Sequence, residues 1–312
     1  MKANELFNLW IEKYTKHAVK QRTYERYYLI IKNHLLPKFG SKDVKNISSM
    51  DIQNFIVDLI NGNGGEKKLS ENTVYSIMSV FKQSLKLAYD LEIIEKLPFR
   101  SVKMPKIEEK KLEVFSLVEY DNLIDYCLSH KRSYIGIVIC LFTGIRIGEL
   151  LALTWGDIDF DKKILSISKT TYQAKVENKY VTVIDKPKTK TSIRVIPLPR
   201  QLMVILKSYK KRSTSNFIVA KNDLENIPIR SYQKTFKNIL KKLDIPYRSF
   251  HSLRHTFATY ALENGMDVKS LAEILGHKNP MITLNRYSHS LMDYKQTQMN
   301  KLGKILENKN SK

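Results

Sequence analysis

The sequence predicts a mainly α-helical protein with a small antiparallel β-sheet, divided into a helical amino-terminal domain and an α+β carboxy-terminal domain. Two observations predict this division. Apolar residues recur at helical spacing through residues 1–97, whereas the alternating apolar residues typical of strands are confined to residues 158–195. The length of 312 residues agrees with about two domains, and 43% hydrophobic residues suffice for real cores.

The spacing of apolar residues predicts four helices in the first domain, residues 1–97. They are expected at 6–14, at 23–36, from Ser49 to residue 60, and from Ser70 to residue 88. The second helix is expected to end at Pro37 and Gly40, because proline and glycine are helix stop signals. The glycines between residues 61 and 65 predict a loop, and no Gly-Lys-Ser/Thr follows that would make it a phosphate-binding loop.

Residues 98–113 are expected to form an interdomain linker, because they hold two prolines, several basic residues and no apolar periodicity. The second domain, residues 114–290, mixes both kinds of element. Helices are expected at 116–129, 133–142, from about Gly148, and at 200–211, 231–243, 251–263, 267–275 and 279–287. Strands are expected at 158–160, 165–167, 181–183 and 193–195, in one small antiparallel sheet.

The charge of the chain narrows its partners. Fifty-three Lys and Arg against 31 Asp and Glu give a net charge of +22, with an excess in both domains. This favours nucleic acid over an anionic membrane surface or a merely basic enzyme. No apolar run approaches the ~18 residues that a membrane span needs, and no secretory signal is visible, so we expect a cytoplasmic protein. Cys127 and Cys140 are expected to be reduced core residues.

The densest motif is His-Ser-Leu-Arg-His-Thr at residues 251–256. On a helix, His251 and Arg254 point to the same side, and together they suit a phosphate group, because arginine binds its oxygens and histidine moves protons. A zinc site with His255 is excluded because Ser252 stands where a glutamate is needed and no third ligand is evident. A helix that merely packs on DNA or on the protein itself is the alternative.

A second motif, residues 143–150, places Arg146 between two glycines after an apolar helix. A charge there needs a partner, which is either Glu149 at i+3 or a ligand anion, and the two are compatible. A third segment holds Lys188 and Lys190 in a predicted hairpin, where an exposed basic turn is the simpler interpretation. The sequence also contains Leu-Gly-His at residues 275–277 and Arg-Tyr-Ser-His at residues 286–289.

Together these segments resemble the tyrosine recombinases, or phage-type integrases, over nearly the whole chain. The Gly-x-Arg-x-Gly-Glu-Leu box, His-x-Leu-Arg-His-x-x-Ala, Leu-Gly-His and the Tyr-Ser-His context occur in the family's order and spacing. The helical first domain resembles the family's core-site-binding domain. The resemblance implies a site-specific recombinase that clamps DNA between its domains. It would cleave and rejoin strands through a 3′-phosphotyrosyl intermediate, without ATP, metal or other cofactor.

The resemblance also assigns roles to the motif residues. Tyr287 matches the nucleophile, and Arg146 and Arg254 match the pair that clamps the scissile phosphate. Glu149 matches the acidic residue that supports the first arginine.

The remaining matches concern proton transfer. Lys190 matches the general acid, and we choose it over Lys188 because it lies nearer the following strand. His251 matches the proton-handling histidine, and His277 matches a position that is His or Trp in the family.

The resemblance further implies partners and a setting. The expected partners are double-stranded DNA recombination sites and DNA-bending accessory proteins. The chain is expected to act as a homotetramer on DNA, with the tail at 291–312 packed on a neighbouring protomer. The expected setting is the bacterial cytoplasm. The long stretch 168–190 resembles integrases of phages and conjugative elements, here without an arm-binding domain. A Xer-like resolvase, a type IB topoisomerase and a non-catalytic DNA-binding regulator are the alternatives, and a frayed basic tail is the alternative for residues 291–312.

Overall fold

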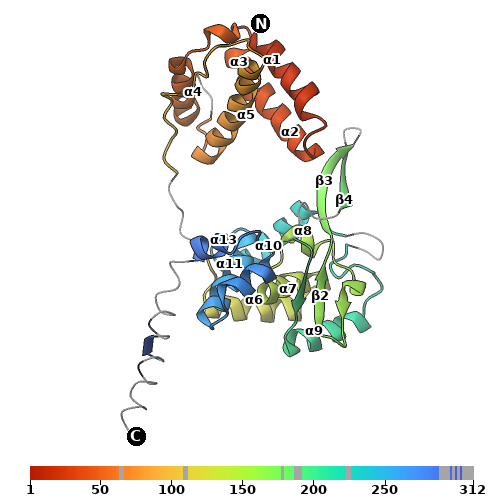
Figure 1. Cartoon of the computed structure of the whole chain (residues 1–312). Helices are drawn as coiled ribbons and strands as arrows, with labels where there is room; N and C mark the ends of the chain where they lie inside the picture. Colours follow the sequence, from red (N-terminus) through yellow and green to blue (C-terminus); the bar gives the residue numbers. More distant parts are fainter. Residues whose placement is uncertain are drawn as a thin grey trace. The chain divides into compact units, whose positions relative to one another are not determined.

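The chain forms two compact units, Met1–Lys110 and Lys111–Lys312, in the computed structural model (Figure 1). The structure describes residues 1–62, 67–107, 112–176, 179–185, 192–221 and 226–287, and positions 296, 299, 300 and 303. The boundary between the units falls inside the segment expected to be a linker, residues 98–113. In the part of the chain so described, no helix has the length and apolar character that a membrane crossing requires.

The first unit consists of helices around one apolar core. Its elements are α1 (Ala3–Leu9) with a π-helical continuation (Trp10–Thr15), α2 (Gln21–Ile30), a π-helical segment (Ile31–Leu35), α3 (Leu36–Phe39), a short 3₁₀-helix (Val44–Asn46), α4 (Ser49–Asn61) and α5 (Glu71–Asp90). Each helix of the unit turns apolar side chains into this core, and Phe39 and Phe81 meet there with ring centroids 4.7 Å apart. The helical first domain is thus as the sequence predicts.

Of the two stop signals expected for the second helix, Gly40 is the C-cap of the helical run, whereas Pro37 does not end it. The second helix does not stop at Pro37 but continues through a π-helical segment into α3, which ends at Phe39. Pro37 lies in the first turn of α3, where a missing N–H costs no helical hydrogen bond. Pro37 therefore lies at the start of a new helical segment here and does not end the helical run that begins with α2.

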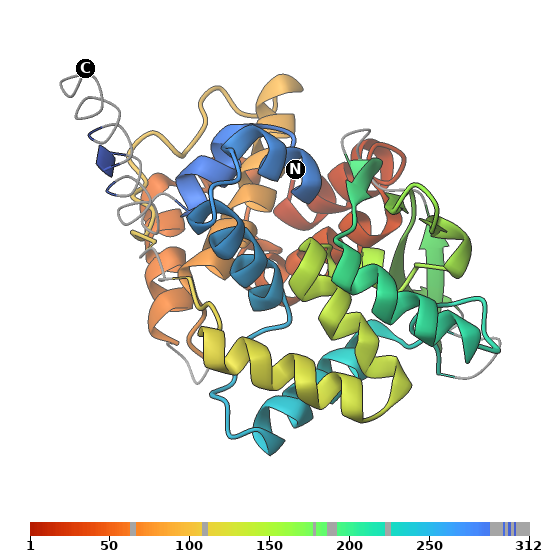
Figure 2. The ribbon, with the colours of Figure 1, turned by 90° about the horizontal axis from the view of Figure 1, so that it is seen from below.

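The helices of the second unit surround the fully apolar α7. They are α6 (Leu117–Ser129), a 3₁₀-helix (Arg132–Tyr134), α7 (Ile135–Thr143), α8 (Ile147–Leu150), a 3₁₀-helix (Trp155–Asp157), α9 (Arg200–Lys211), α10 (Ile229–Lys242), α11 (His251–Glu263), α12 (Val268–Leu275) and α13 (Pro280–Tyr287). Cys127 and Cys140 lie buried in this core as free thiols. Helices α11 to α13, in blue, lie together in both views (Figures 1 and 2).

The strands form two sheets instead of the single sheet expected. Strands β1 (Ile158–Asp159), β2 (Ile164–Ile167) and β5 (Arg194–Pro197) form one antiparallel sheet in the order β1-β2-β5. Strands β3 (Thr170–Val176) and β4 (Lys179–Asp185) form a separate two-stranded ribbon. The sequence analysis missed β3 because its residues are mostly polar. The predicted hairpin around Lys190 is also wrong, since the flanking strands β4 and β5 belong to different sheets.

Candidate active site

The first part of the site is built where α7 ends. Gly144 takes a positive φ of 62° and stops the helix, and a Cβ at this position would collide with the Phe257 ring and lie 2.8 Å from Leu275. Only glycine suits both conditions. The chain then turns into α8 with Arg146 at its N-cap, so the guanidinium lies at the edge of a buried core, with 39% of its side chain exposed.

Gly148, the second glycine of the motif at residues 143–150, is required because no room exists for a side chain. A Cβ on Gly148 would lie 2.7 Å from Thr170 Oγ1 and 2.9 Å from the Thr171 carbonyl oxygen. The start of β3 is therefore pressed directly against the backbone of α8. This contact sets the distance between the helix that carries Glu149 and the β3–β4 ribbon.

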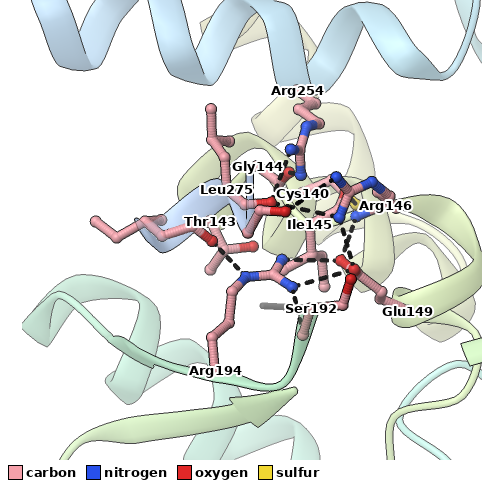
Figure 3. Close-up of polar contacts among 12 residues, drawn as sticks. Cys140, Thr143, Gly144, Ile145, Arg146, Glu149, Ser192, Arg194, Arg254 and Leu275 are labelled. Atoms are coloured by element: carbon pink, nitrogen blue, oxygen red, sulfur yellow. Dashed lines mark hydrogen bonds and ion pairs between the residues drawn. The ribbon is translucent and has the colours of Figure 1, made fainter. Parts of the chain in front are cut away.

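The Glu149 carboxylate is the centre of the site and is saturated with donors (Figure 3). Oε1 accepts from Arg146 Nη1 at 2.9 Å and from Arg194 Nη1 at 3.1 Å. Oε2 accepts from Arg194 Nη2 and from the Arg146 backbone N–H, both at 2.9 Å. The side chain is only 4% exposed. Burial raises the pKa of this carboxyl, but hydrogen bonds and charge from Arg194, followed by the Arg146 charge, lower it below its ordinary value.

Arg194 is a member of this site that the sequence analysis missed. It begins β5, and its side chain is 6% exposed. Besides both Glu149 oxygens, it binds the carbonyl oxygens of Ile274 and Ser192. One guanidinium thus connects α8, β5 and the end of α12. The signal in the sequence is an arginine four positions after Lys190 at the start of a strand.

Arg254 lies almost completely buried on α11, with 2% of the residue exposed. Its Nη1 donates to the Gly144 carbonyl oxygen at 2.8 Å, and its Nη2 donates to the Leu275 carbonyl oxygen at 2.7 Å. Burial and, after it, the nearby Arg146 charge lower the pKa of this guanidinium to about 9. Arg254 therefore remains cationic at neutral pH.

The carboxyl end of α12 holds all three arginines through main-chain carbonyls. The oxygens used are those of Ile274, Leu275 and Gly276, and Leu275 accepts from two guanidinium groups at once. The last carbonyls of a helix have no partner within the helix and carry partial negative charge. The end of α12 thus supplies acceptors without placing a second acidic side chain in the site.

His277 has a defined tautomer. Arg254 Nη2 lies 2.9 Å from its Nε2, and a guanidinium can only donate, so Nε2 accepts. The ring hydrogen is then on Nδ1, which lies 2.7 Å from Thr283 Oγ1 and donates to it. This neutral imidazole is fixed at both nitrogens between Arg254 and a fully buried threonine.

Tyr287 and His255 form a second buried contact. The Tyr287 hydroxyl lies 2.8 Å from His255 Nδ1, and the two residues are 2% and 7% exposed. His251 lies exposed at the start of α11, with its ring edge-on to that of His255 at 4.5 Å between centroids.

The charges of the site favour an anionic ligand. Two guanidinium groups, those of Arg146 and Arg194, bind the Glu149 carboxylate, and a third, that of Arg254, shares the Leu275 carbonyl with Arg146 (Figure 3). One carboxylate against three guanidinium groups leaves two positive charges uncompensated within this group of residues. Such a cluster is costly in a poorly solvated place unless an anion completes it. Arginine offers planar, bidentate binding to phosphate oxygens, so a phosphate group fits these charges.

The structure brings together most of the residues singled out in the sequence. Arg146, Glu149, Arg254 and His277 form one hydrogen-bonded group, and Tyr287 joins α11 through His255, a residue to which the sequence analysis gave no role. Lys188 and Lys190, and residues 291–312 apart from positions 296, 299, 300 and 303, lie outside the described residues. Among the residues described, no three His, Cys, Asp or Glu side chains gather as metal ligands would.

Both units match known protein families. Residues 113–293 match the phage integrase family, and residues 4–60 match the phage integrase N-terminal SAM-like domain. A XerC-like tyrosine recombinase of Caldanaerobacter subterraneus is 30% identical over 91% of this chain and 78% of its own length. The ICEBs1 integrase of Bacillus subtilis is 26% identical over 92% of this chain and 79% of its own.

Solved structures share the fold. The Tn1549 transposon integrase in complex with a circular intermediate DNA superposes with a TM-score of 0.80, at 24% identity, over 97% of this chain and 99% of that one. A λ integrase dimer bound to a core site gives a TM-score of 0.70, at 16% identity, over 92% and 95%. The predicted fold class, mainly helical with small antiparallel β-structure, is confirmed.

Proposed function

This chain belongs to the phage integrase family, and from that premise we propose that it is a site-specific tyrosine recombinase that integrates and excises a mobile element. It would cleave and rejoin double-stranded DNA through a 3′-phosphotyrosyl intermediate. The observation that carries the proposal is the group of three arginines, two on the Glu149 carboxylate and Arg254 on the same Leu275 carbonyl as Arg146, with Tyr287 hydrogen-bonded to the residue after Arg254. The cluster provides the charge that a scissile phosphate needs, and the phenol provides a nucleophile.

In the proposed reaction, Arg146 and Arg254 bind the non-bridging oxygens of the phosphate, and Glu149 keeps Arg146 in place. Charge that develops on these oxygens in the transition state is stabilised by groups already oriented, typically the largest contribution to such catalysis. Tyr287 attacks phosphorus and the 5′-oxygen leaves. The phosphotyrosine bond conserves the energy of the phosphodiester, so rejoining to another strand needs no ATP.

Three further residues are assigned to proton transfer and orientation. Lys190 would protonate the leaving 5′-oxygen as general acid. His277 would fix the Arg254 guanidinium, as its hydrogen bond supports. His251, at the exposed start of α11, would face the DNA and handle protons near the phosphate.

Double-stranded recombination sites are the proposed partner. The net charge of +22 and the DNA complexes of structural relatives support this partner. We propose that the two units clamp the duplex, that four copies assemble on two sites, with residues 291–312 packing on a neighbouring protomer, and that DNA-bending proteins assist. The reaction would take place in the bacterial cytoplasm.

Resolution of chromosome dimers is the second candidate, because the XerC-like relative is 30% identical over most of the chain. Joined products would arise from either activity. The two are separated by substrate choice: an integrase joins an element's attachment site to a different target site, whereas a resolvase acts on two copies of the same site.

The test is covalent trapping on DNA. The wild-type chain should form a protein–DNA adduct that survives SDS, and Tyr287→Phe should bind the same DNA without forming any adduct. A stable adduct in Tyr287→Phe would refute the assignment of Tyr287 as the nucleophile. Tyr89→Phe serves as a matched control, because Tyr89 is an exposed tyrosine of the first unit, and it should form the adduct at the wild-type level.

A further inference from the structure

Helix α11 sends two neighbouring side chains in different directions. Successive residues of an α-helix point about 100° apart. Arg254 accordingly reaches the carbonyls at the ends of α7 and α12, whereas His255 reaches α13. The contact that His255 makes there is with the hydroxyl of Tyr287, the atom that would attack phosphorus.

We propose that His255 is a catalytic residue that accepts the proton of the Tyr287 hydroxyl through Nδ1 during strand cleavage. The inference rests on the proposed function of Tyr287 as nucleophile. A phenol has an ordinary pKa of about 10 and is a poor nucleophile near pH 7 unless a base takes its proton. His255 Nδ1 lies 2.8 Å from the hydroxyl oxygen, within the distance that direct proton transfer requires.

Burial makes this pair more specific than a surface contact. His255 and Tyr287 are 7% and 2% exposed, so the transfer takes place away from bulk water. Tyr287 is a buried member of the apolar cluster of α11, α12 and α13, which includes Leu271 and Leu275. In such surroundings a phenol proton leaves only towards a group that is already in place, and the imidazole is such a group.

His251 is less suited to this step. It stands one helical turn earlier on α11, exposed, and its ring contacts the His255 ring edge to face. The imidazole nitrogen within hydrogen-bond distance of the Tyr287 hydroxyl is Nδ1 of His255. We therefore assign His251 to the DNA-facing side of the site and His255 to the nucleophile Tyr287.

The step balances in protons and bonds. The Tyr287 O–H bond breaks and its proton moves to His255 Nδ1, while the phenol oxygen bonds to phosphorus. The bond from phosphorus to the 5′-oxygen breaks, and that oxygen takes a proton from the general acid, proposed as Lys190. In rejoining, a 5′-hydroxyl gives its proton to the neutral amine left on the general acid and attacks phosphorus, and the imidazolium of His255 returns its proton to the departing phenol oxygen. The proposal requires neutral His255 to carry its hydrogen on Nε2.

The first experiment compares His255→Asn with the wild type on two DNA substrates. Asparagine places an amide oxygen near the position of Nδ1, so it can hold the hydroxyl but cannot take its proton. One substrate is ordinary DNA, and the other has sulfur as the bridging 5′-atom, a leaving group that needs no general acid. We expect cleavage to slow about 100-fold or more on both substrates, with unchanged DNA affinity. Cleavage by His255→Asn within about threefold of the wild type would overturn the proposal.

Matched variants identify the cause of a loss. His130→Asn, at the end of α6, should cleave at the wild-type rate. Lys190→Ala should be slow on ordinary DNA only, because sulfur replaces the need for the acid. Rescue of His255→Asn by the sulfur substrate would overturn the proposal, since it would place the defect at the leaving group. If the wild-type chain formed no adduct, the proposed function itself would have failed, before any variant is considered.

A second measurement does not depend on a variant that folds. Nitrogen NMR of the histidine rings in the full-length wild-type chain distinguishes the two neutral tautomers. We expect His255 to show hydrogen on Nε2 and a hydrogen-bonded, unprotonated Nδ1, and this Nδ1 signal to shift in Tyr287→Phe. A His255 ring with its hydrogen on Nδ1 would overturn the proposal.

Discussion

The Arg194 guanidinium binds both carboxylate oxygens of Glu149, with Nη1 to Oε1 at 3.1 Å and Nη2 to Oε2 at 2.9 Å. Glu149 in turn holds Arg146 through its side chain and its backbone N–H. The orientation of an arginine proposed to bind the phosphate therefore depends on a second arginine that reaches the same carboxylate from β5. Arg194 is thereby a positioning residue for Arg146.

Arg194→Met should destabilise the second unit and slow cleavage more than it weakens DNA binding. The methionine keeps apolar volume but leaves the buried carboxylate with Arg146 as its remaining ion-pair partner. We expect a loss of about 3 kcal/mol in the free energy of unfolding, measured by denaturant titration at pH 7. The double variant Glu149→Gln/Arg194→Met should recover part of this loss, and a double variant less stable than Arg194→Met would contradict the pairing.

The same pair predicts a pH dependence. The pKa of Glu149 is lowered in the folded chain, so its charge stabilises the fold above its unfolded pKa, and this stability is lost as the pH falls through the folded pKa. In Arg194→Met, the effect of burial, which raises the pKa of Glu149, is no longer opposed by the Arg194 charge. The carboxyl therefore takes up a proton at higher pH than in the wild type. The difference in unfolding free energy between wild type and variant should be largest near pH 7 and shrink towards pH 4. A constant difference across this range would show that Glu149 is not the group affected.

Gly148→Ala should disturb the site by steric clash, without changing any charge or hydrogen-bonding group. The new Cβ would lie 2.7 Å from Thr170 Oγ1 and 2.9 Å from the Thr171 carbonyl oxygen, so α8 and β3 must move apart. We expect a loss of about 1–3 kcal/mol in unfolding free energy and slower cleavage, because Glu149 and Arg146 flank the moved residue. Gly156→Ala is the control, since the nearest atom to a Cβ there is 3.9 Å away, and it should behave as the wild type.

Lys190 and Lys188 can be separated by the leaving group. If Lys190 is the general acid, Lys190→Ala should cleave ordinary DNA about 100-fold or more slowly and recover with a 5′-bridging sulfur. Lys188→Ala should be close to the wild type on both substrates. Recovery by sulfur in Lys188→Ala instead would move the acid two residues upstream.

The helices were largely predictable because their ends carry local signals. Residues 200–211 and 251–263 were predicted as helices and agree with α9 and α11. Strand β3 was missed, since its polar residues pair with β4 in a ribbon whose start is held against the backbone at Gly148. The course of α3 through Pro37 was missed as well, because it depends on the π-helical segment before it.

The site was predictable where its residues lie in short motifs. Arg146 and Glu149 are three positions apart, and their ion pair follows from helical spacing. Arg194 meets Glu149 across 45 positions and Ile274 across 80, so its role depends on how distant segments fold together. His255 stands next to Arg254 in the motif, but its contact with Tyr287, 32 positions later, depends on how α13 packs against α11.

The carbonyls that end α12 have a consequence for how this protein tolerates change. The acceptors that hold the three arginines belong to the main chain at Ile274, Leu275 and Gly276, so replacing the side chain of Ile274 or Leu275 leaves every acceptor atom in place. A survey of side-chain substitutions would pass over the Leu275 carbonyl oxygen, which accepts from both Arg146 and Arg254. Replacing the amide that follows Leu275 with an ester, which weakens that carbonyl as an acceptor, would reveal it. In this protein, part of what positions the cations is carried by main-chain atoms, which the side chains of Ile274 and Leu275 do not reveal.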